Sequence, residues 1–329
     1  MNQLKYNYAF IGYRDYYLLS LDELAQEMEI VINSDPWNSY NMGLKQICRA
    51  HFSSSVYKYV DLPLKFIWRK GICKAEFSTQ KPICFILYGS NPTVYVNGLV
   101  SYIKKHYKQS IVVLQCTDKV EWYKKRFGIK KFEQTAKQVD LVVTYNQVDA
   151  EKYGYELFPP IIPDYSKYQN KSNASFSDIL YVGRSKGRTD LIHLIYERAT
   201  ERGLICDFTI IGVPKEDRLS NTNINYDRFL DYRDVIDKIN QTKCILNIPQ
   251  EGAAGLSLRD FEAIGNHKYI LTNNLDIINS PLISRNQILL FDDNAVADYS
   301  KIRVPLLYNS QEMKHFDWRN RIEWIEKKL

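Results

Sequence analysis

The stretch Asn247-Ile-Pro-Gln-Glu-Gly-Ala-Ala-Gly-Leu-Ser-Leu-Arg-Asp-Phe-Glu-Ala-Ile-Gly265 tells most about how this chain folds. It overlaps an apolar run at residues 244–248 that suits a buried strand. The glycines of the loop let backbone amides approach a ligand. Ser257, with Asp260 three positions later, forms a capping-box pattern that predicts a helix start. The free amides and positive dipole end of such a helix form a natural anion site, which Asp260 would partly oppose.

The helical periodicity of this stretch raises a question about Glu262. Helical periodicity places Leu258 and Phe261 on an apolar face with Glu262 at its border, while Arg259 turns away from that face. A half-buried carboxylate needs hydrogen-bond donors. Two sources remain open: the ribose hydroxyls of a bound nucleotide, or Arg259 three residues earlier, a pair worth roughly a few tenths of a kcal/mol on an exposed helix.

The stretch resembles the donor-binding motif of GT-B glycosyltransferases, in particular bacterial capsule, exopolysaccharide and lipopolysaccharide enzymes with a Gly-Leu-Ser/Thr-x-Arg-x-x-Glu core. Three further segments extend the resemblance over roughly the C-terminal two thirds of the chain, in the order the family would place them: residues 140–154, 178–188 and 268–274. The resemblance implies an α/β fold of two Rossmann-like domains facing a cleft, with a C-terminal helix crossing back onto the N-terminal domain. It also assigns residues to the donor diphosphate: Gly255, Leu256, Ser257 and Arg259. Glu262 would hold the ribose.

The chain departs from the family at one position. Many retaining members carry another glutamate eight positions before the one at 262, where this chain has Ala254. Glu251 lies in the same loop but out of register. The stereochemistry of transfer therefore stays open between retention and inversion.

The composition is that of a folded protein with room for two domains. Of its 329 residues, 45% are hydrophobic and 25% charged, which argues against disorder. The longest apolar runs are far shorter than the roughly 20 residues of a membrane-spanning helix. No signal-peptide pattern is present at the N-terminus. The six cysteines are widely spaced without a C-x-x-C pair. We therefore expect a cytoplasmic protein with free thiols and no zinc site.

Positive charge is concentrated in one segment. The net charge is +6, and residues 101–137 contain ten lysines and arginines against three acidic residues, interleaved with aromatic side chains. Such a mixture favours an anionic partner, although two solvated helix faces explain it equally well. Among partners, an anionic membrane surface ranks first. Nucleic acid is not expected, because no recognisable nucleic-acid motif accompanies the charge.

Alternating patterns predict two α/β domains. In the first half we expect strands at 29–33, 83–88, 111–116 and 140–144 and helices at 18–28, 94–107 and 121–138. In the second half we expect strands at 179–183, 206–212, 243–248, 268–272 and 287–291 and helices at 189–202, 232–241 and 257–266. The proline-rich run 158–163 looks like a linker. The predicted domains are an acceptor-side domain at 1–158, a nucleotide-sugar domain at 159–310, and a terminal helix at 311–329.

The loop after the strand at 179–183 is a second candidate for the donor diphosphate. Ligands of parallel sheets sit beyond the carboxyl ends of the strands. The loop offers small and cationic residues that suit a pyrophosphate: Gly183, Arg184, Lys186 and Arg188. A solvated basic turn is the alternative. By resemblance the donor base would lie near Gly212, with Phe229 or Tyr232 packing on it, although aromatic residues at such spacing are more often core.

Candidate catalytic bases follow the strands of the first domain. Asp118 is favoured, with Asp35 and Asp15 as further candidates, because an inverting enzyme needs a carboxylate to deprotonate the acceptor hydroxyl. The alternative for Asp118 is a cap on the helix that starts near Val120. No Asp-x-Asp element is present, so we expect no metal site and no cofactor.

These observations predict a metal-independent glycosyltransferase that moves a sugar, expected to be a hexose and preferably from UDP, to a bacterial surface polysaccharide or lipid-linked saccharide. It would act in the cytoplasm, peripherally at the inner face of the membrane. Two alternatives remain: a non-catalytic anion-binding module that docks on membrane or nucleic acid, and a sugar-nucleotide epimerase of the same fold. Hydrolase, NTPase and dehydrogenase motifs are absent.

Overall fold

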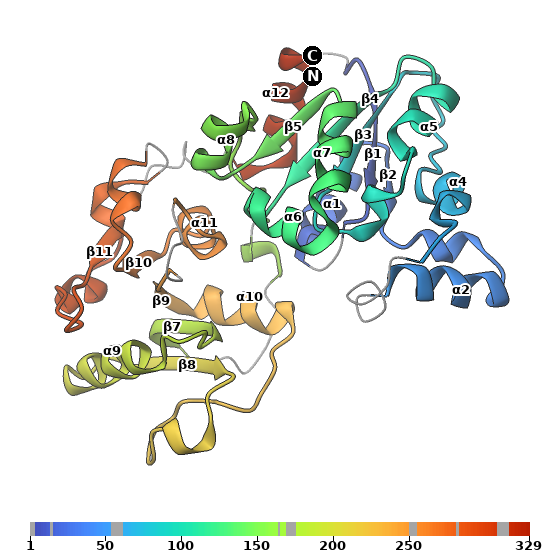
Figure 1. Ribbon diagram of the computed structural model, residues 1–329. Coiled ribbons are helices and arrows are strands. Elements are labelled where there is room, and N and C mark those ends of the chain that lie inside the picture. Colours follow the sequence, from blue (N-terminus) through green and yellow to red (C-terminus); the bar gives the residue numbers. More distant parts are fainter. Residues whose placement is uncertain are drawn as a thin grey trace. The chain divides into compact units, whose positions relative to one another are not determined.

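The computed structural model describes residues 4–13, 16–53, 62–163, 165–168, 176–249, 255–280, 283–307 and 316–329 (Figure 1). The chain divides into two compact units. Unit 1 comprises Met1–Ile161 and Trp318–Leu329, and unit 2 comprises Ile162–Asp317.

Unit 1 contains a six-stranded parallel sheet in the order β2-β1-β3-β4-β5-β6. Its strands are β1 (Asn7–Ile11), β2 (Ile30–Asn33), β3 (Ile83–Tyr88), β4 (Ile111–Cys116), β5 (Leu141–Thr144) and β6 (Glu156–Leu157). Its α-helices are α1 (Tyr16–Ala25), α2 (Met42–Phe52), α4 (Arg69–Ile72), α5 (Leu99–His106), α6 (Val120–Phe127), α7 (Ile129–Gln138), α8 (Gln147–Tyr153) and α12 (Trp318–Lys328). Short 3-10 helices are η1 (Pro36–Ser39), η2 (Lys65–Trp68) and η3 (Pro92–Tyr95).

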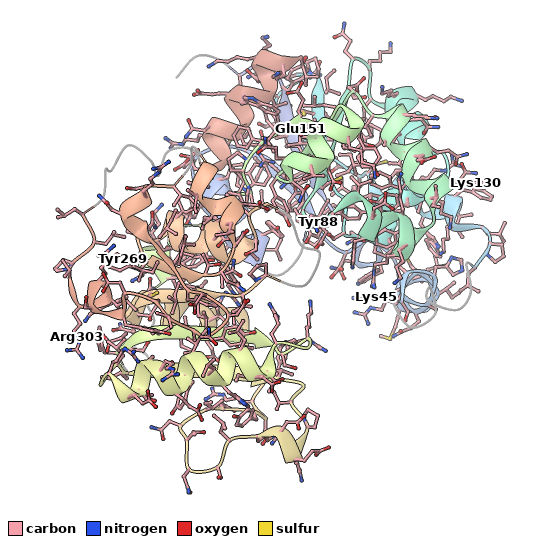
Figure 2. All side chains as sticks on the ribbon, turned by 60° about the vertical axis from the view of Figure 1, so that its left-hand side comes forward. Lys45, Tyr88, Lys130, Glu151, Tyr269 and Arg303 are labelled. Atoms are coloured by element: carbon pink, nitrogen blue, oxygen red, sulfur yellow. The ribbon has the colours of Figure 1, made fainter. Side chains whose placement is uncertain are left out.

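The strand order of unit 1 reverses between β1 and β3, which makes that position a topological switch point. Ligands of open parallel sheets bind beyond the carboxyl ends of the strands at such a point. Tyr88, labelled in Figure 2, ends β3 at this edge of the sheet. Its ring packs against Tyr13, just beyond β1, at a centroid distance of 5.1 Å.

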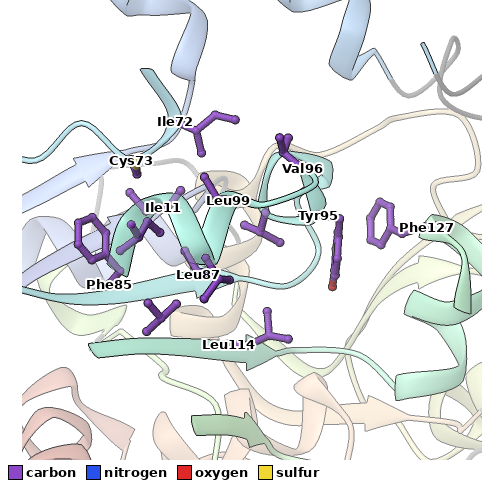
Figure 3. Close-up of a cluster of buried hydrophobic side chains, with 14 of the residues drawn as sticks. Ile11, Ile72, Cys73, Phe85, Leu87, Tyr95, Val96, Leu99, Leu114 and Phe127 are labelled. Carbon is purple, nitrogen blue, oxygen red and sulfur yellow. The ribbon is translucent and has the colours of Figure 1, made fainter. Parts of the chain in front are cut away.

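Both faces of this sheet are covered by helices, as the alternation of side chains along a strand requires. Ala9 and Ile11 join a core cluster with buried residues of α5, α6 and α7, part of which Figure 3 shows. Tyr8 and Phe10 point to the opposite face and pack with α1 and α12.

The C-terminal helix therefore belongs to unit 1. Trp318 at the start of α12 packs edge-on against Phe10 at 4.7 Å, and its indole nitrogen donates to the hydroxyl of Ser20 in α1 at 3.0 Å. Arg321 of the same helix is buried, donates to the carbonyl oxygen of Pro159 and lies over the ring of Phe158. These contacts fasten the end of the chain to the place where it first leaves unit 1.

Unit 2 contains a five-stranded parallel sheet in the order β11-β10-β9-β7-β8. Its strands are β7 (Ser177–Arg184), β8 (Cys206–Ile211), β9 (Thr242–Asn247), β10 (Tyr269–Thr272) and β11 (Ile288–Leu290). Its α-helices are α9 (Thr189–Glu201), α10 (Tyr232–Gln241) and α11 (Leu258–Gly265). Its 3-10 helices are η4 (Tyr165–Tyr168), η5 (Lys215–Asp217), η6 (Leu275–Asn279), η7 (Arg285–Gln287) and η8 (Tyr299–Arg303). The strand order of this sheet reverses between β7 and β9.

The structure confirms the predicted fold class of α/β with two parallel sheets, and it corrects several elements. Strand β1 was not predicted. The helix expected at 121–138 is two helices, because Gly128 between them adopts a left-handed φ of 96°. The described part of the terminal helix begins at Trp318, and residues 311–315 of the expected helix lie outside the described residues. Among the described residues, no helix is long and apolar enough to cross a bilayer.

Candidate functional site

Arg188 joins two loops at the switch point of the second sheet. Its guanidinium donates to the carbonyl oxygen of Ile248, just beyond β9, and to that of Arg184, at the end of β7, the latter at 2.8 Å. Its Nε donates to the carbonyl oxygen of Ser185 at 3.0 Å. One side chain thus spans the position where this type of sheet binds ligands. Arg188 supplies the positive charge expected there while its hydrogen bonds shape the loop.

Arg259 approaches the same switch point from α11. It donates to the carbonyl oxygen of Val182 in β7 at 3.0 Å and forms an ion pair with Glu262. Of the two partners considered for Glu262, the pair with Arg259 is therefore formed. Because Glu262 is fully buried, removing either partner would leave a buried charge without its counter-charge, which makes the loss of either costly.

Two tyrosine hydroxyls complete the surroundings of the Glu262 carboxylate. Tyr232, at the start of α10, donates to Oε1 at 2.6 Å, and Tyr165 of η4 lies 3.3 Å from the same oxygen. The two hydroxyls also contact each other. Burial and the nearby carboxylate raise the pKa of both tyrosines well above the ordinary value. Both therefore stay protonated and serve as donors.

The contacts of Glu262 bear on its predicted ribose role. Oε1 faces the two tyrosines and Oε2 faces Arg259. Ribose hydroxyls are donors of the same kind as the tyrosine hydroxyls. A ribose would have to replace one of these tyrosine contacts in order to bind the carboxylate directly.

The start of α11 has the geometry of an anion site. Ser257 is its N-cap and shares a capping box with Asp260, whose Oδ2 accepts from the Ser257 amide at 2.7 Å. Among the described residues, which leave out 250–254, the buried Ser257 hydroxyl has no acceptor for its own proton. Asn247, at the end of β9, donates to the other oxygen of Asp260 at 2.8 Å. Burial raises the pKa of Asp260 and outweighs these hydrogen bonds, which act to lower it.

Gly255 precedes this helix start and has a left-handed φ of 75°, which glycine adopts without strain. Its amide donates to the carboxylate of Asp276 in η6 at 2.7 Å, and its carbonyl oxygen accepts from Asn274 at 2.9 Å. The amide predicted to bind a diphosphate thus already holds a carboxylate. Leu256 follows it with a partly exposed side chain. Residues 250–254, including Glu251, lie outside the described residues.

The loop after β7 presents its cations to solvent. Arg184 and Lys186 are exposed, and neither has an ion-pair partner in the described part of the chain. Lys186 and Gly187 both have a positive φ, 46° and 78°, so the loop turns sharply away from the strand. Gly183, one residue before the end of β7, lies beside the ring of Tyr181.

The residues assigned to the donor base differ in their surroundings and in their exposure to solvent. Gly212, just after β8, has a φ of 84°, and its carbonyl oxygen accepts from the Ser185 hydroxyl at 3.1 Å, which brings it to the loop after β7. Phe229 exposes 78% of its surface. Tyr232 contacts Glu262 through its hydroxyl and Tyr165 through its ring.

In unit 1, Asp118 lies beyond the carboxyl end of β4. Its carboxylate accepts from the hydroxyl of Ser90, beyond β3, at 3.3 Å. The hydroxyl of buried Tyr123 accepts from the amides of Thr117 and Asp118 at 2.6 and 2.8 Å and holds this loop in place. Burial raises the pKa of Tyr123 well above its ordinary value.

The alternative role of Asp118, a cap on the next helix, is wrong. The N-cap of α6 is Lys119, and the amide of Val120 donates to the carboxylate of Asp149 in α8 at 2.8 Å. Asp35 follows β2 at the start of η1. Asp15 lies outside the described residues.

Sequence reasoning missed four polar residues that organise these two edges: Tyr165, Asn247, Asn91 and Asp149. Asn247 ends a strand beside the capping box, and it is the first residue of the 247–265 stretch. Asn91 donates to the carbonyl oxygen of Gly12 at 2.8 Å, across the switch point between β1 and β3. Tyr165 and Asp149 carry no local signal, because each meets its partner through the tertiary fold.

Comparison with known proteins supports the architecture. No protein-family model matches the sequence, and neither does any curated protein. Solved structures match along almost the whole chain. An α-glucosyltransferase in complex with UDP and a 13-mer DNA containing an HMU base is 13% identical, with 99% of both chains covered and a TM-score of 0.55. The UDP-GlcNAc 2-epimerase from Methanocaldococcus jannaschii is 12% identical, with 98% of this chain and 99% of that chain covered and a TM-score of 0.54. An α,α-trehalose-phosphate synthase (UDP-forming) from Burkholderia vietnamiensis is 10% identical, with 91% of this chain and 87% of that chain covered and a TM-score of 0.52.

The chain has the GT-B fold. Likeness at such low identity shows the fold alone, so the chemistry of this GT-B protein must be argued from its own residues. Within the described residues no group of three or more His, Cys, Asp or Glu is placed to hold a metal ion. The positive charges at the switch point of unit 2 come from arginine and lysine side chains: Arg184, Lys186, Arg188 and Arg259.

Proposed function

We propose that this GT-B protein is a glycosyltransferase that moves a sugar from a nucleoside diphosphate sugar, preferably UDP-linked, to a bacterial surface polysaccharide or lipid-linked saccharide. The observation that carries the proposal is the convergence of Arg188 and Arg259 on the switch point between β7 and β9. Two guanidinium groups at the carboxyl edge of a parallel sheet, beside the start of a helix, suit a diphosphate.

The donor would be held in unit 2. Arg184 and Lys186 are exposed cations on the loop that Arg188 shapes, and the Ser257 hydroxyl has a proton to donate at the start of α11. We assign the diphosphate to these residues. As the glycosidic bond breaks, negative charge grows on the leaving diphosphate, and contacts with fixed cations strengthen. These side chains would perform that task without a metal ion.

The ribose and base would lie next to the diphosphate. We keep Glu262 as the ribose ligand, with Tyr232 giving up its hydroxyl contact as the nucleotide binds. Gly212 is placed for the base, because its carbonyl oxygen is tied to the diphosphate loop through Ser185. UDP is preferred because it is the commonest donor nucleotide of such enzymes, and the preference does not rest on a uracil-reading residue.

The acceptor would be activated in unit 1. Asp118 lies at the carboxyl edge of its sheet and is not used as a helix cap. In an inverting reaction its carboxylate would take the proton of the acceptor hydroxyl. The acceptor oxygen would bond to the anomeric carbon while the bond from that carbon to the diphosphate breaks, and the electron pair would leave with the diphosphate.

A nucleotide-binding assay tests the donor site first. UDP, GDP and dTDP are added singly, and the melting temperature is measured for the wild type, Arg259→Ala and Glu262→Ala. A rise with one nucleotide that both variants reduce supports the proposal, since ligands that bind only the native state raise its stability. If none of the three shifts the wild type, the proposal is wrong.

Product analysis then separates the reaction classes. Slow hydrolysis without acceptor releases free nucleotide in either case. With an acceptor, a transferase forms a heavier glycoside, whereas an epimerase forms none and yields a sugar of inverted configuration. A non-catalytic anion-binding module would show salt-sensitive binding that survives Arg259→Ala. Mass spectrometry of the products decides between the enzymatic outcomes.

A further inference from the structure

The segment between β2 and β3 of unit 1 exposes large apolar side chains on two neighbouring elements. Helix α2 and the region of η2 carry the following exposures: Met42 81%, Leu44 43%, Ile47 51%, Leu64 59%, Phe66 48% and Ile67 50%. We call these six residues the α2–η2 surface. Contiguous exposed apolar patches are uncommon on folded proteins and mark binding surfaces.

The elements that carry this surface are held in place from their inner side. Cys48 and Phe52 of α2 are buried in the core. The indole nitrogen of Trp68 in η2 donates to His51 at 2.9 Å, and the two rings meet edge-on at 5.7 Å. Because these contacts join the C-terminal half of α2 to η2, the two sets of exposed apolar side chains belong to one packed structure.

Positive charge surrounds the apolar side chains. Between Asp35 and Glu76 the sequence has seven lysines and arginines and one acidic residue, Asp61. Of the basic residues near the surface, Lys45, Arg49, Arg69 and Lys70 have no ion-pair partner among the residues described. Arg69 instead lies over the ring of Phe66 at 5.3 Å. Long cationic side chains beside apolar ones suit a boundary between lipid and water.

We propose that the α2–η2 surface docks unit 1 on an anionic lipid bilayer. Its apolar side chains would enter the boundary between headgroups and acyl chains, and the surrounding lysines and arginines would face the lipid phosphates. This proposal deepens the proposed function, because a lipid-linked acceptor is presented at such a surface. Charge complementarity selects the bilayer over a second copy of this chain, whose matching surface would be equally positive.

The basic segment at 101–137 fits this role less well. It exposes two large apolar residues, Trp122 at 38% and Ile129 at 58%. Two of its lysines have acidic partners: Lys104 with Asp140 at 2.8 Å and Lys124 with Glu133 at 3.2 Å. It therefore offers charge with little apolar area. In Figure 2, Lys45 marks α2 and Lys130 marks this second basic segment.

Vesicle co-sedimentation tests the docking surface. The full-length protein is mixed with vesicles of phosphatidylcholine alone or of phosphatidylcholine with phosphatidylglycerol. We expect binding to the anionic vesicles only. The variant Ile47→Ser/Phe66→Ser/Ile67→Ser should reduce this binding by about tenfold or more, because affinity scales with buried apolar area. Its control is Val296→Ser/Leu307→Ser, which changes exposed apolar residues of unit 2 and should bind as the wild type does.

A charge-reversal pair separates the two basic surfaces. Lys45→Glu/Arg49→Glu should lower anionic-vesicle binding by about tenfold or more. Lys130→Glu/Lys137→Glu on α7 changes the net charge equally and should have the smaller effect. All variants should keep the nucleotide-induced melting shift of the wild type, so loss of docking is distinguishable from failure of the proposed donor site.

Three results would overturn the docking proposal. The first is failure of the wild type to bind anionic vesicles. The second is a triple serine variant that binds as tightly as the wild type. The third is a dimer of the wild type, seen by light scattering, that the same triple variant disperses, because a second copy would then occupy the surface.

Discussion

The guanidinium of Arg259 contacts the carboxylate of Glu262, which lies three residues later in α11, and reaches the carbonyl oxygen of Val182 in β7 with its other nitrogen. This pair joins the helix that carries the donor motif to the strand that carries the cationic loop. Burial alone would lower the pKa of Arg259, but Glu262 and the neighbouring tyrosines raise it. Arg259 therefore remains charged inside the fold.

A double-mutant cycle tests the energetic coupling of this pair. Glu262→Leu leaves Arg259 without its carboxylate, and Arg259→Met leaves a fully buried carboxylate unpaired, so each single change should cost about 3 kcal/mol or more of unfolding free energy. The double variant should cost much less than the sum. Urea unfolding measures the three values, and strict additivity would show that the pair is not coupled.

The contribution of Arg188 to stability and nucleotide binding should depend on the shape of its side chain as well as on its charge. Arg188→Lys keeps the charge but cannot reach the carbonyl oxygens of Ser185, Arg184 and Ile248 together. We expect a loss of about 1.5–3 kcal/mol in stability, typical of a hydrogen bond to a charged group, together with weaker nucleotide binding. A lysine variant with wild-type stability and affinity would show that charge alone matters.

Asp276 competes with any phosphate for the amide of Gly255. Asp276→Asn removes the negative charge and weakens this contact, so nucleotide diphosphates should bind several-fold more tightly, by roughly the effect of one nearby charge. Isothermal titration at low and high salt measures the change. Asp292→Asn, an exposed carboxylate of unit 2, is the matched control. Unchanged affinity in Asp276→Asn would remove Gly255 from the diphosphate site.

Loss of the Asp118 carboxylate should lower the catalytic rate, whereas loss of the Asp149 carboxylate should lower stability. Asp149→Ala removes the acceptor of the Val120 amide at the start of α6 and should lower stability by about 1 kcal/mol. Asp118→Asn should leave stability nearly unchanged and lower kcat by about a hundredfold or more. Thermal unfolding and steady-state transfer kinetics separate the two roles. A fully active Asp118→Asn enzyme would exclude Asp118 as the base.

Lys268 should make the stability of unit 2 depend on pH. Burial lowers the pKa of this amine to about 8 in the folded protein, against about 10.4 when unfolded. Between these values the unfolded state binds the extra proton, so the free energy of unfolding should rise with pH relative to a variant that lacks the amine. Urea unfolding of the wild type and Lys268→Met across this window measures the difference. A difference that stays constant would mean that the amine titrates normally.

The periodic apolar pattern was sufficient to predict most elements of unit 2. Helix α10 was predicted with the bounds it has, Tyr232–Gln241, and each strand of its sheet was placed within a few residues. These elements are long or are bounded by clear breakers, so local pattern and tertiary packing agree. Strand β1 was not predicted, because its five residues begin with asparagine and form only a short apolar run. The full burial of both faces hides the usual alternation.

Some features of the candidate site could likewise be predicted from local sequence, and others could not. A strand, a glycine loop, a capping box and a cationic turn are local features, so the sequence by itself was sufficient to predict two segments of unit 2 that suit an anion. Tertiary structure alone decided that Arg188 and Arg259 both donate to backbone carbonyl oxygens beside the reversal between β7 and β9. It also decided that Tyr165 reaches Glu262 from 97 positions earlier. Strand order and long-range burial are set by how helices pack on the two faces of the sheet. No local run of residues contains that information.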